Sequence, residues 1–367
     1  MRKLPRRDLE GNALFQHGGR GLPGLERALD FSSNINPLGP PRRVLDALCR
    51  ALPEVARYPD ADCTALTHCL AAQHGVAPEQ IVVGNGSTEL IYATARACRP
   101  QRVAIAEPTF TEYLRASRLV GAAVDHWLAQ GSQIDLEPFE PGNADLVWLC
   151  NPNNPTGRLW PPGSLPRWIR NQSATRFVVD EAFLPFLESE PEHSLVPLVH
   201  GSAKVIVLRS LTKLFALPGL RLGYAIAARP FADSIRAELP PWSVNRLAQI
   251  AGLAALDDHD FLARTRTWFR AERSSFHQAL EGLSHHLQII PSEANFFLLR
   301  LRQGSSAGLA TALAEDGISI RDASNFVGLA AGDFRVAVRT AAENSRLVGA
   351  LHSLLDEKGN RPWGVRS

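Results

Sequence analysis

Several features that would assign a chain to a class at once are missing from this sequence of 367 residues. Its five cysteines are odd in number and include no C-x-x-C pair, so neither a disulfide framework nor a structural zinc site is indicated, and no metal ligands are predicted. No run reaches the roughly 18 uninterrupted apolar residues of a membrane helix, and no apolar signal-peptide core follows the basic start. The formal net charge of +2 gives no general attraction to nucleic acid or membrane. We therefore expect a cytoplasmic protein with neither kind of partner.

What the chain does contain is a globular composition and an alternation of short apolar runs. Hydrophobic residues make up 45% of it and charged residues 21%, and the length suffices for about two domains. From about residue 42 the runs are β-branched, as in strands buried on both faces, and helical patterns such as 87–97 and 166–172 separate several of them. The alternation predicts an α/β domain with a largely parallel sheet. Its expected strands, with their following turns, are 81–87, 102–108, 146–157, 176–183, 204–213 and 221–227.

The pattern changes after about residue 240. A long helical stretch at 246–283 precedes strand-like and helical segments of α+β character, at 294–301, 306–316, 318–322 and 334–340, and a closing helix to about 356. The sequence therefore predicts a second, smaller domain. We expect four parts in all: an N-terminal arm at 1–41, a large domain at 42–240, a small domain at 241–356 and a flexible tail at 357–367.

Polar clusters follow several predicted strands, where open α/β sheets bind their ligands. After the first strand Gly86 allows a tight turn. Ser87 and Thr88 then begin a helix whose free N–H groups either suit a phosphate or are simply capped. Asp180 ends another apolar run, where a buried carboxylate needs an ion-pair partner, an N-capping role or a protonated heterocyclic nitrogen.

Three further signals complete the pattern. Asn154, in the turn NPNNPTG, either closes the turn or donates to a phenolate oxygen, and Phe110 is either core or a platform for a flat ring. The stretch SLTKLFALPGLRLGY at 210–224 places Lys213 among hydroxyls in an otherwise apolar run. In this order, the segments resemble the fold type I aminotransferase superfamily, whose members use pyridoxal 5'-phosphate. The resemblance covers almost the whole chain and implies a large α/β domain with a smaller C-terminal α+β domain.

The resemblance also implies how the cofactor would be held. Lys213 would bind it covalently and later shuttle protons, and Asp180 would keep its pyridine nitrogen protonated. Asn154 would bind the phenolic oxygen, and Phe110 would stack on the ring. Phe183 stands where many members carry a tyrosine, so one contact to the phenolic oxygen is missing. The cofactor phosphate would be held by a larger set, namely Gly86, Ser87, Thr88, Ser210 and Arg221.

Tyr58, in the segment RYPD, resembles a tyrosine that reaches across a dimer interface to the cofactor phosphate of the other subunit. The alternative is an aromatic side chain in an ordinary loop. The resemblance implies a homodimer with shared active sites.

Two segments of the arm point to the substrate. HGGR at 17–20 and DFSSNINPLG at 30–39 closely resemble the threonine-phosphate decarboxylases of cobalamin biosynthesis. NINPLG alone is also similar to histidinol-phosphate aminotransferases, but the HGG element and the longer second segment favour the decarboxylases. The resemblance implies that His17 and Asn36 help to bind the substrate, although a histidine beside two glycines is more often an exposed loop residue.

Three arginines in the predicted small domain supply positive charge for an anionic substrate. Arg335 matches the superfamily's carboxylate-binding arginine, Arg321 adds a second cation, and Arg339 shares a strand face with Arg335. The alternative for each is a surface ion pair. With Asn154, they indicate a phosphorylated or anionic amino compound as substrate. The resemblance to the decarboxylases implies PLP-dependent decarboxylation of the phosphorylated amino acid L-threonine O-3-phosphate to (R)-1-amino-2-propanol O-2-phosphate and CO₂. The nearer rival is a histidinol-phosphate-type aminotransferase using 2-oxoglutarate, and a distant one is a non-catalytic module of the same fold.

Overall fold

The computed structural model describes residues 1–3, 15–19, 28–131 and 134–357. Two predicted parts of the chain extend outside these residues: the arm, at 4–14 and at 20–27 with Arg20 of HGGR, and the tail beyond Glu357. None of the helices within the described ranges is long and apolar enough to cross a membrane.

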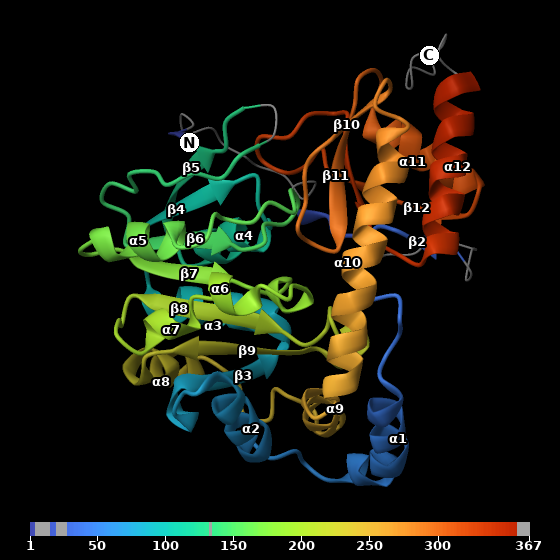
Figure 1. The fold of residues 1–367 in the computed structure, drawn as a ribbon. Helices are drawn as coiled ribbons and strands as arrows, with labels where there is room; N and C mark the ends of the chain where they lie inside the picture. The colour runs from blue at the N-terminus through green and yellow to red at the C-terminus, as the bar shows by residue number, and fades with distance from the viewer. Residues whose placement is uncertain (4–14, 20–27, 132–133, 358–367) are drawn as a thin grey trace.

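An eight-stranded sheet forms the larger part of the molecule, with the strand order β1-β5-β4-β6-β7-β8-β9-β3 (Figure 1). Neighbours from β5 to β8 run parallel, whereas β1, β9 and β3 join in antiparallel fashion. The predicted α/β class with a largely parallel sheet is confirmed. The strands are β1 (Arg2–Lys3), β3 (Ile81–Asn85), β4 (Arg102–Glu107), β5 (Ala123–Leu128), β6 (Leu146–Cys150), β7 (Arg176–Asp180), β8 (Val205–Ser210) and β9 (Leu222–Ala227).

Helices cover both faces of this sheet, because its strand residues alternate between two apolar layers. In β6, Leu146 and Trp148 pack into the layer formed with α3, α4 and α8, whereas Val147 and Leu149 pack into the layer formed with α5 and α7. Burial on both faces explains the continuous apolar runs of the sequence. The helices are α3 (Gly86–Cys98), α4 (Glu112–Leu119), α5 (Ser164–Asn171), α6 (Glu190–His193), α7 (Val196–Val199) and α8 (Arg229–Ala237).

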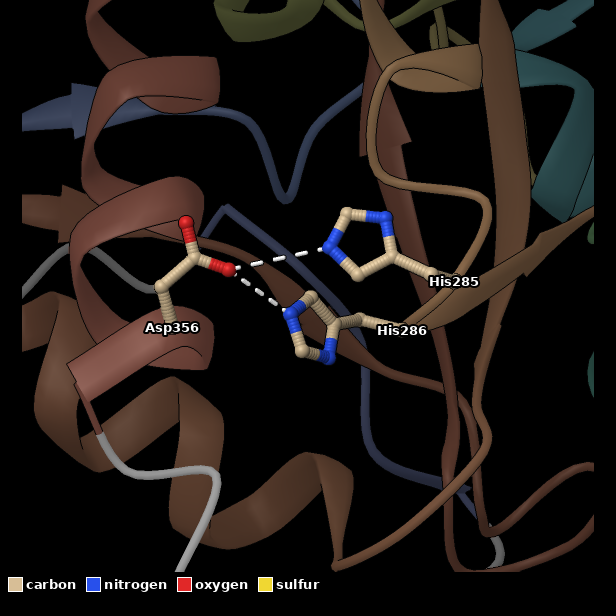
Figure 2. Close-up of side chains that lie close together, drawn as sticks. All are labelled: His285, His286 and Asp356. Atoms are coloured by element: carbon tan, nitrogen blue, oxygen red, sulfur yellow. Dashed lines mark hydrogen bonds and ion pairs between the residues drawn. The ribbon is translucent and has the colours of Figure 1, made fainter.

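A four-stranded antiparallel sheet, in the order β10-β11-β14-β13, forms the second part. Helices α10 and α12 pack against each other beside it (Figure 1). The arm joins this part, because β2 pairs in parallel with β12. Just before β10, His285 and His286 point toward Asp356 of α12 (Figure 2). The elements are β2 (Leu29–Asp30), β10 (Leu287–Ile289), β11 (Phe296–Leu301), β12 (Ile318–Ser319), β13 (Arg321–Asp322), β14 (Asp333–Ala337), α10 (His259–Glu281), α11 (Ser306–Glu315) and α12 (Ala341–Glu357).

The transition between the two parts differs from the predicted pattern. The helical stretch expected at 246–283 is two helices, α9 (Arg246–Leu256) and α10. The break occurs because the side chain of Asp258 caps α10 by accepting a hydrogen bond from the N–H of Phe261 at 3.0 Å. Helix α9 packs against two N-terminal helices, α1 (Arg42–Ala51) and α2 (Thr64–His74). The segment after residue 240 therefore begins in contact with the first part of the molecule.

Candidate active site

A cavity of about 540 Å³ opens at the carboxyl ends of the parallel strands β6, β7 and β8. The last residues of these strands, Cys150, Asp180 and Ser210, all line it, and the small sheet contributes Arg321 and Arg335. Open α/β sheets bind ligands at this position. The cavity is lined by eleven of the residues predicted for the site: His17, Ser87, Thr88, Phe110, Asn154, Asp180, Ser210, Lys213, Arg221, Arg321 and Arg335.

One end of the cavity is shaped for a phosphate. Helix α3 begins at Gly86, and the first N–H groups of a helix have no partners within it. The Arg221 guanidinium packs onto Gly86 so closely that a Cβ there would lie 2.4 Å from Nη2. Gly86 also has a φ of +80°, in the region that favours glycine. The backbone conformation therefore favours glycine at this position, and a side chain here would also displace the Arg221 guanidinium.

Ser210 is the last residue of β8, and its pairing with the neighbouring strand β9 places it at the same end of the cavity. Ser210 pairs with Gly223, and a Cβ at Gly223 would lie 2.4 Å from the backbone nitrogen of Ser87. The Ser210 hydroxyl also lies 2.7 Å from Oγ1 of Thr212. The five residues predicted to hold a phosphate thus come together from three separate segments.

Lys213 follows β8 in a turn that the arm holds in place. The N–H of Asn36 donates to the Lys213 carbonyl at 3.1 Å, and the side-chain amide of Asn36 donates to the Leu214 carbonyl at 2.7 Å. Burial, with the positive charges of Arg335 and Arg221, lowers the pKa of the Lys213 amine from 10.5 to about 8. A lysine with so low a pKa is neutral often enough near pH 7 to act as a nucleophile.

Asp180 is the buried carboxylate of the site. Its oxygens accept hydrogen bonds from the Tyr113 hydroxyl at 2.8 Å and from the Ala182 N–H at 2.9 Å, and the Tyr113 ring stacks on Trp148. Burial nevertheless raises the pKa of Asp180, against these hydrogen bonds and the charge of Lys213. No ion pair to Asp180 forms within the described ranges, so a cationic group entering the cavity would find a carboxylate to partner.

Arg335 extends from β14 into the other end of the cavity. Its guanidinium donates to Oδ1 of Asn154 and, at 2.8 Å, to the Ser32 carbonyl of the arm. Burial, with the nearby charge of Arg321, lowers the pKa of Arg335 to about 9. Its Nε is buried with no hydrogen-bond partner among the described residues. An anion bound here would relieve both the repulsion and the desolvation of this guanidinium.

His17 of the arm lies on the same side, against helix α4. Its Nε2 is 2.8 Å from Oε1 of Glu112, and its ring lies 5.6 Å from the ring of Phe110. Glu112 also accepts a hydrogen bond from the Tyr92 hydroxyl. Burial raises the pKa of Glu112, but the hydrogen bonds from His17 and Tyr92 outweigh it, and the net pKa is lowered. Glu112 thus remains ionised and holds the imidazole at the cavity wall.

Three predicted site residues lie elsewhere. Asn36 is buried beneath the Lys213 turn, and its amide is used by Leu214 and by Thr265 Oγ1 at 3.1 Å, so it supports the lysine rather than lining the cavity. Arg339 follows the end of β14 and donates to the Asp30 carbonyl and to Glu343, which leaves it outside the cavity. The third, Tyr58, is 78% exposed.

Three polar residues of the site, Tyr92, Glu112 and Tyr113, were not identified from the sequence. The segment EPTFTEY contains the last two beside Phe110, and their position immediately after a predicted strand was the available signal. Tyr113 meets Asp180 across 67 residues of chain, a contact that no local pattern predicts.

Residues 26–351 match the model of a family described as aminotransferase class I and II. The chain belongs to this family. Membership confirms the predicted pyridoxal 5'-phosphate cofactor.

Threonine-phosphate decarboxylases and histidinol-phosphate aminotransferases are both among the similar proteins. Threonine-phosphate decarboxylase of Salmonella typhimurium is 40% identical, over 90% of this chain and 92% of the relative. Histidinol-phosphate aminotransferase 2 of Ralstonia nicotianae is 34% identical, over 90% of each chain. The crystal structure of L-threonine-O-3-phosphate decarboxylase from Porphyromonas gingivalis superposes with a TM-score of 0.83 at 32% identity, covering 89% of this chain and 99% of that one.

The residues present fit the cofactor of this aminotransferase family. The Gly86 cradle with Arg221 suits its phosphate, and Asp180 suits a protonated ring nitrogen. Lys213 offers an amine of lowered pKa between them. Phe110 and Phe183 line the walls of the cavity, where an aromatic ring would be held.

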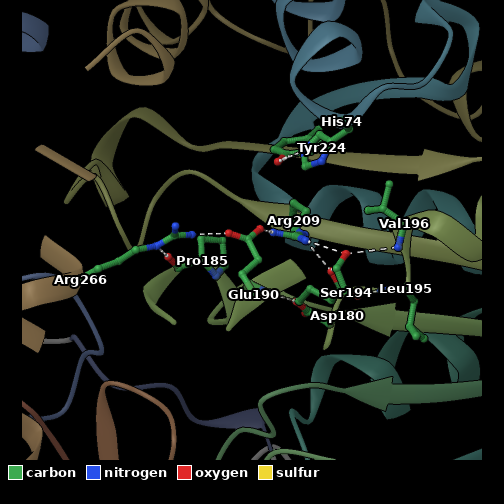
Figure 3. Close-up of polar contacts among 12 residues, drawn as sticks. His74, Asp180, Pro185, Glu190, Ser194, Leu195, Val196, Arg209, Tyr224 and Arg266 are labelled. Atoms are coloured by element: carbon green, nitrogen blue, oxygen red, sulfur yellow. Dashed lines mark hydrogen bonds and ion pairs between the residues drawn. The ribbon is translucent and has the colours of Figure 1, made fainter. Parts of the chain in front are cut away.

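A buried charge network centres on Arg209, which precedes the cavity residue Ser210 in β8 (Figure 3). Arg209, which is only 2% exposed, forms ion pairs with Glu181 at 2.7 Å and with Glu190. Arg266 of α10 donates to the other oxygen of Glu190, and so connects the network to the second part of the molecule. Since Glu181 and Arg209 each adjoin a cavity residue in sequence, the network fixes the ends of β7 and β8.

We expect Arg209→Met to lower the free energy of unfolding by about 3–5 kcal/mol, because it leaves Glu181 and Glu190 buried without their cation. The matched control is Arg270→Met, whose ion pair with Glu188 is exposed and which should cost about 0–1 kcal/mol. Urea unfolding of each holoenzyme, followed by tryptophan fluorescence, measures both. Similar losses in the two variants would contradict the importance of the buried network.

Proposed function

We propose that this enzyme decarboxylates L-threonine O-3-phosphate to (R)-1-amino-2-propanol O-2-phosphate and CO₂. The observation that carries the proposal is a second anion-binding region in the cavity, formed by Arg335, Arg321 and His17, apart from the Arg221 cradle. A substrate with both a carboxylate and a phosphate matches this excess of positive charge. The 40% identity to the Salmonella typhimurium decarboxylase supports the same choice.

Bound pyridoxal 5'-phosphate supplies an electron sink for the bonds at the substrate's α carbon. Arg335 would bind the carboxylate, and its contacts to Asn154 and Ser32 fix the plane of the guanidinium. That orientation decides which bond at the α carbon is weakened. The amine of Lys213, with a pKa of about 8, can then deliver a proton to the α carbon near neutral pH.

Arg321 and His17 would bind the substrate phosphate. Arg321 is held by the carbonyl of Gln16 at 2.6 Å and by Asn325, and His17 is held by Glu112. Because Gln16 and His17 are neighbours in the arm, this segment covers the phosphate side of the cavity and couples substrate binding to the position of the arm.

The test is CO₂ release from L-threonine O-3-phosphate by the holoenzyme with no 2-oxo acid added. Sustained release supports the decarboxylase. L-threonine without the phosphate is the control substrate, and its kcat/KM should be lower by about 100-fold or more, since it lacks the charge-assisted contacts. The proposal fails if no CO₂ appears while histidinol phosphate and 2-oxoglutarate yield glutamate.

We also propose that the enzyme is a homodimer with shared active sites. The ring of Tyr58 lies tilted against that of Trp242, with 4.9 Å between the ring centroids, and both side chains are exposed, as are Leu52 and Val55 nearby in sequence. Exposed apolar groups of this size favour association with a second copy. Tyr58 does not line the active-site cavity of its own chain, so its side chain is available to the cavity of a partner. Sedimentation of the holoenzyme as a monomer would contradict this assembly.

A further inference from the structure

Three histidines and an aspartate gather on the surface of the second part of the molecule, and none of them lines the cavity. His285 and His286 lie in the turn that precedes β10. His352 and Asp356 lie four residues apart on α12, and so on one face of that helix. In Figure 2 the two imidazoles of the turn point toward the carboxylate of Asp356.

The possible ligand atoms are close enough to share one ion. Nε2 of His286 lies 2.8 Å and Nε2 of His285 lies 3.7 Å from the same Asp356 oxygen, Oδ1. These three ligand atoms lie within 4.8 Å of one another. Nδ1 of His352 lies 3.6 Å from the other carboxylate oxygen. Neighbouring ligand atoms in a tetrahedral zinc site are about 3.4 Å apart, so His285, His286 and Asp356 need only small side-chain rotations to share an ion. His352 would turn toward them from the other side of the carboxylate to complete the shell.

A single histidine would satisfy one carboxylate, and here three imidazoles surround it. The rings of His285 and His286 have centroids only 4.1 Å apart. A neutral imidazole presents one ring nitrogen lone pair, which is the form that binds a metal ion. The four side chains are between 25% and 59% exposed, so an ion can reach them from solvent.

We propose that His285, His286, His352 and Asp356 form a binding site for a zinc ion. Three imidazoles and one carboxylate are a ligand set that zinc accepts in tetrahedral geometry. With all four positions taken by the protein, the site is structural rather than catalytic. The ion would tie α12 to the turn before β10, two segments separated by 70 residues. The cysteine pattern could not reveal this site, because its ligands meet only in the fold.

The test is titration of untagged holoenzyme with ZnCl₂, followed by calorimetry and by thermal unfolding. We expect one ion to bind per chain at this site, and the midpoint of unfolding to rise with zinc and to fall again with a chelator. His286→Asn and Asp356→Asn should each weaken zinc affinity by at least about tenfold. His200→Asn, which replaces an exposed histidine elsewhere, is the matched control and should leave the affinity unchanged.

Co²⁺ in place of zinc reports the ligand type. Visible bands without a thiolate charge-transfer band would support imidazole and carboxylate ligands over an exposed thiol such as Cys49. The proposal is overturned if micromolar zinc does not bind. It is also overturned if both variants keep the full affinity, because the ion then binds elsewhere on the chain.

Discussion

We expect Lys213→Ala to abolish the visible absorbance of the bound cofactor and to lower turnover by at least about 1,000-fold. The variant removes the amine that lies in the turn after β8 and with it the group able to move protons at the α carbon. Absorbance of the dialysed protein and CO₂ release from L-threonine O-3-phosphate measure the two effects. Full turnover in this variant would exclude Lys213 from the chemistry.

The control is Lys204→Ala, whose amine donates to the Gln172 carbonyl and lies outside the cavity, and which should keep both signals. The lowered pKa of Lys213 adds a pH signature. Because only the neutral amine attacks, the rate at which the apoprotein regains absorbance should rise with pH and level off above about 8. A rate that continued to rise toward pH 10 would indicate an amine with the ordinary pKa.

Periodicity predicted the strands that are buried on both faces and missed those with mixed burial. The runs at 146–157 and 176–183 contain β6 and β7, since continuous apolar sequence is what such strands need. Strand β5 (Ala123–Leu128) forms no apolar run, because its two buried residues are the polar Asp125 and His126 and the other four are only partly buried. Two-residue strands such as β2 exist only through pairing with a distant segment.

The site was predictable where a motif places a residue at the end of a strand, as for Asp180 and Ser210. The role of a residue was less predictable where it depends on which tertiary neighbours already hydrogen-bond to its side chain. Asn36 lies in a motif that resembles a substrate-binding segment, yet its amide is occupied by Leu214 and Thr265. Neither Leu214 nor Thr265 adjoins that motif in sequence, and tertiary packing alone brings them to it.

The roles of Arg335 and Arg339 also depend on tertiary contacts, since Arg335 lines the cavity and Arg339 is bound outside it. This difference gives the second prediction. We expect Arg335→Gln to lower kcat/KM for L-threonine O-3-phosphate by about 100-fold, which corresponds to about 2.7 kcal/mol, the range of hydrogen bonds to a charged group. Arg339→Gln should change it by less than about fivefold, because this guanidinium is bound to Asp30 and Glu343 outside the cavity. Steady-state kinetics on both holoenzymes, with thermal unfolding of each, make the comparison.

The pair distinguishes substrate binding from a general need for positive charge. Both variants lose one charge near the arm, so a purely electrostatic effect would lower kcat/KM in both and would weaken as salt is added. Arg335→Lys keeps the charge without the planar fork, and we expect it to recover only part of the loss. If Arg339→Gln lost as much as Arg335→Gln while unfolding normally, Arg339 would have to turn toward the substrate on binding, as its sequence position first indicated.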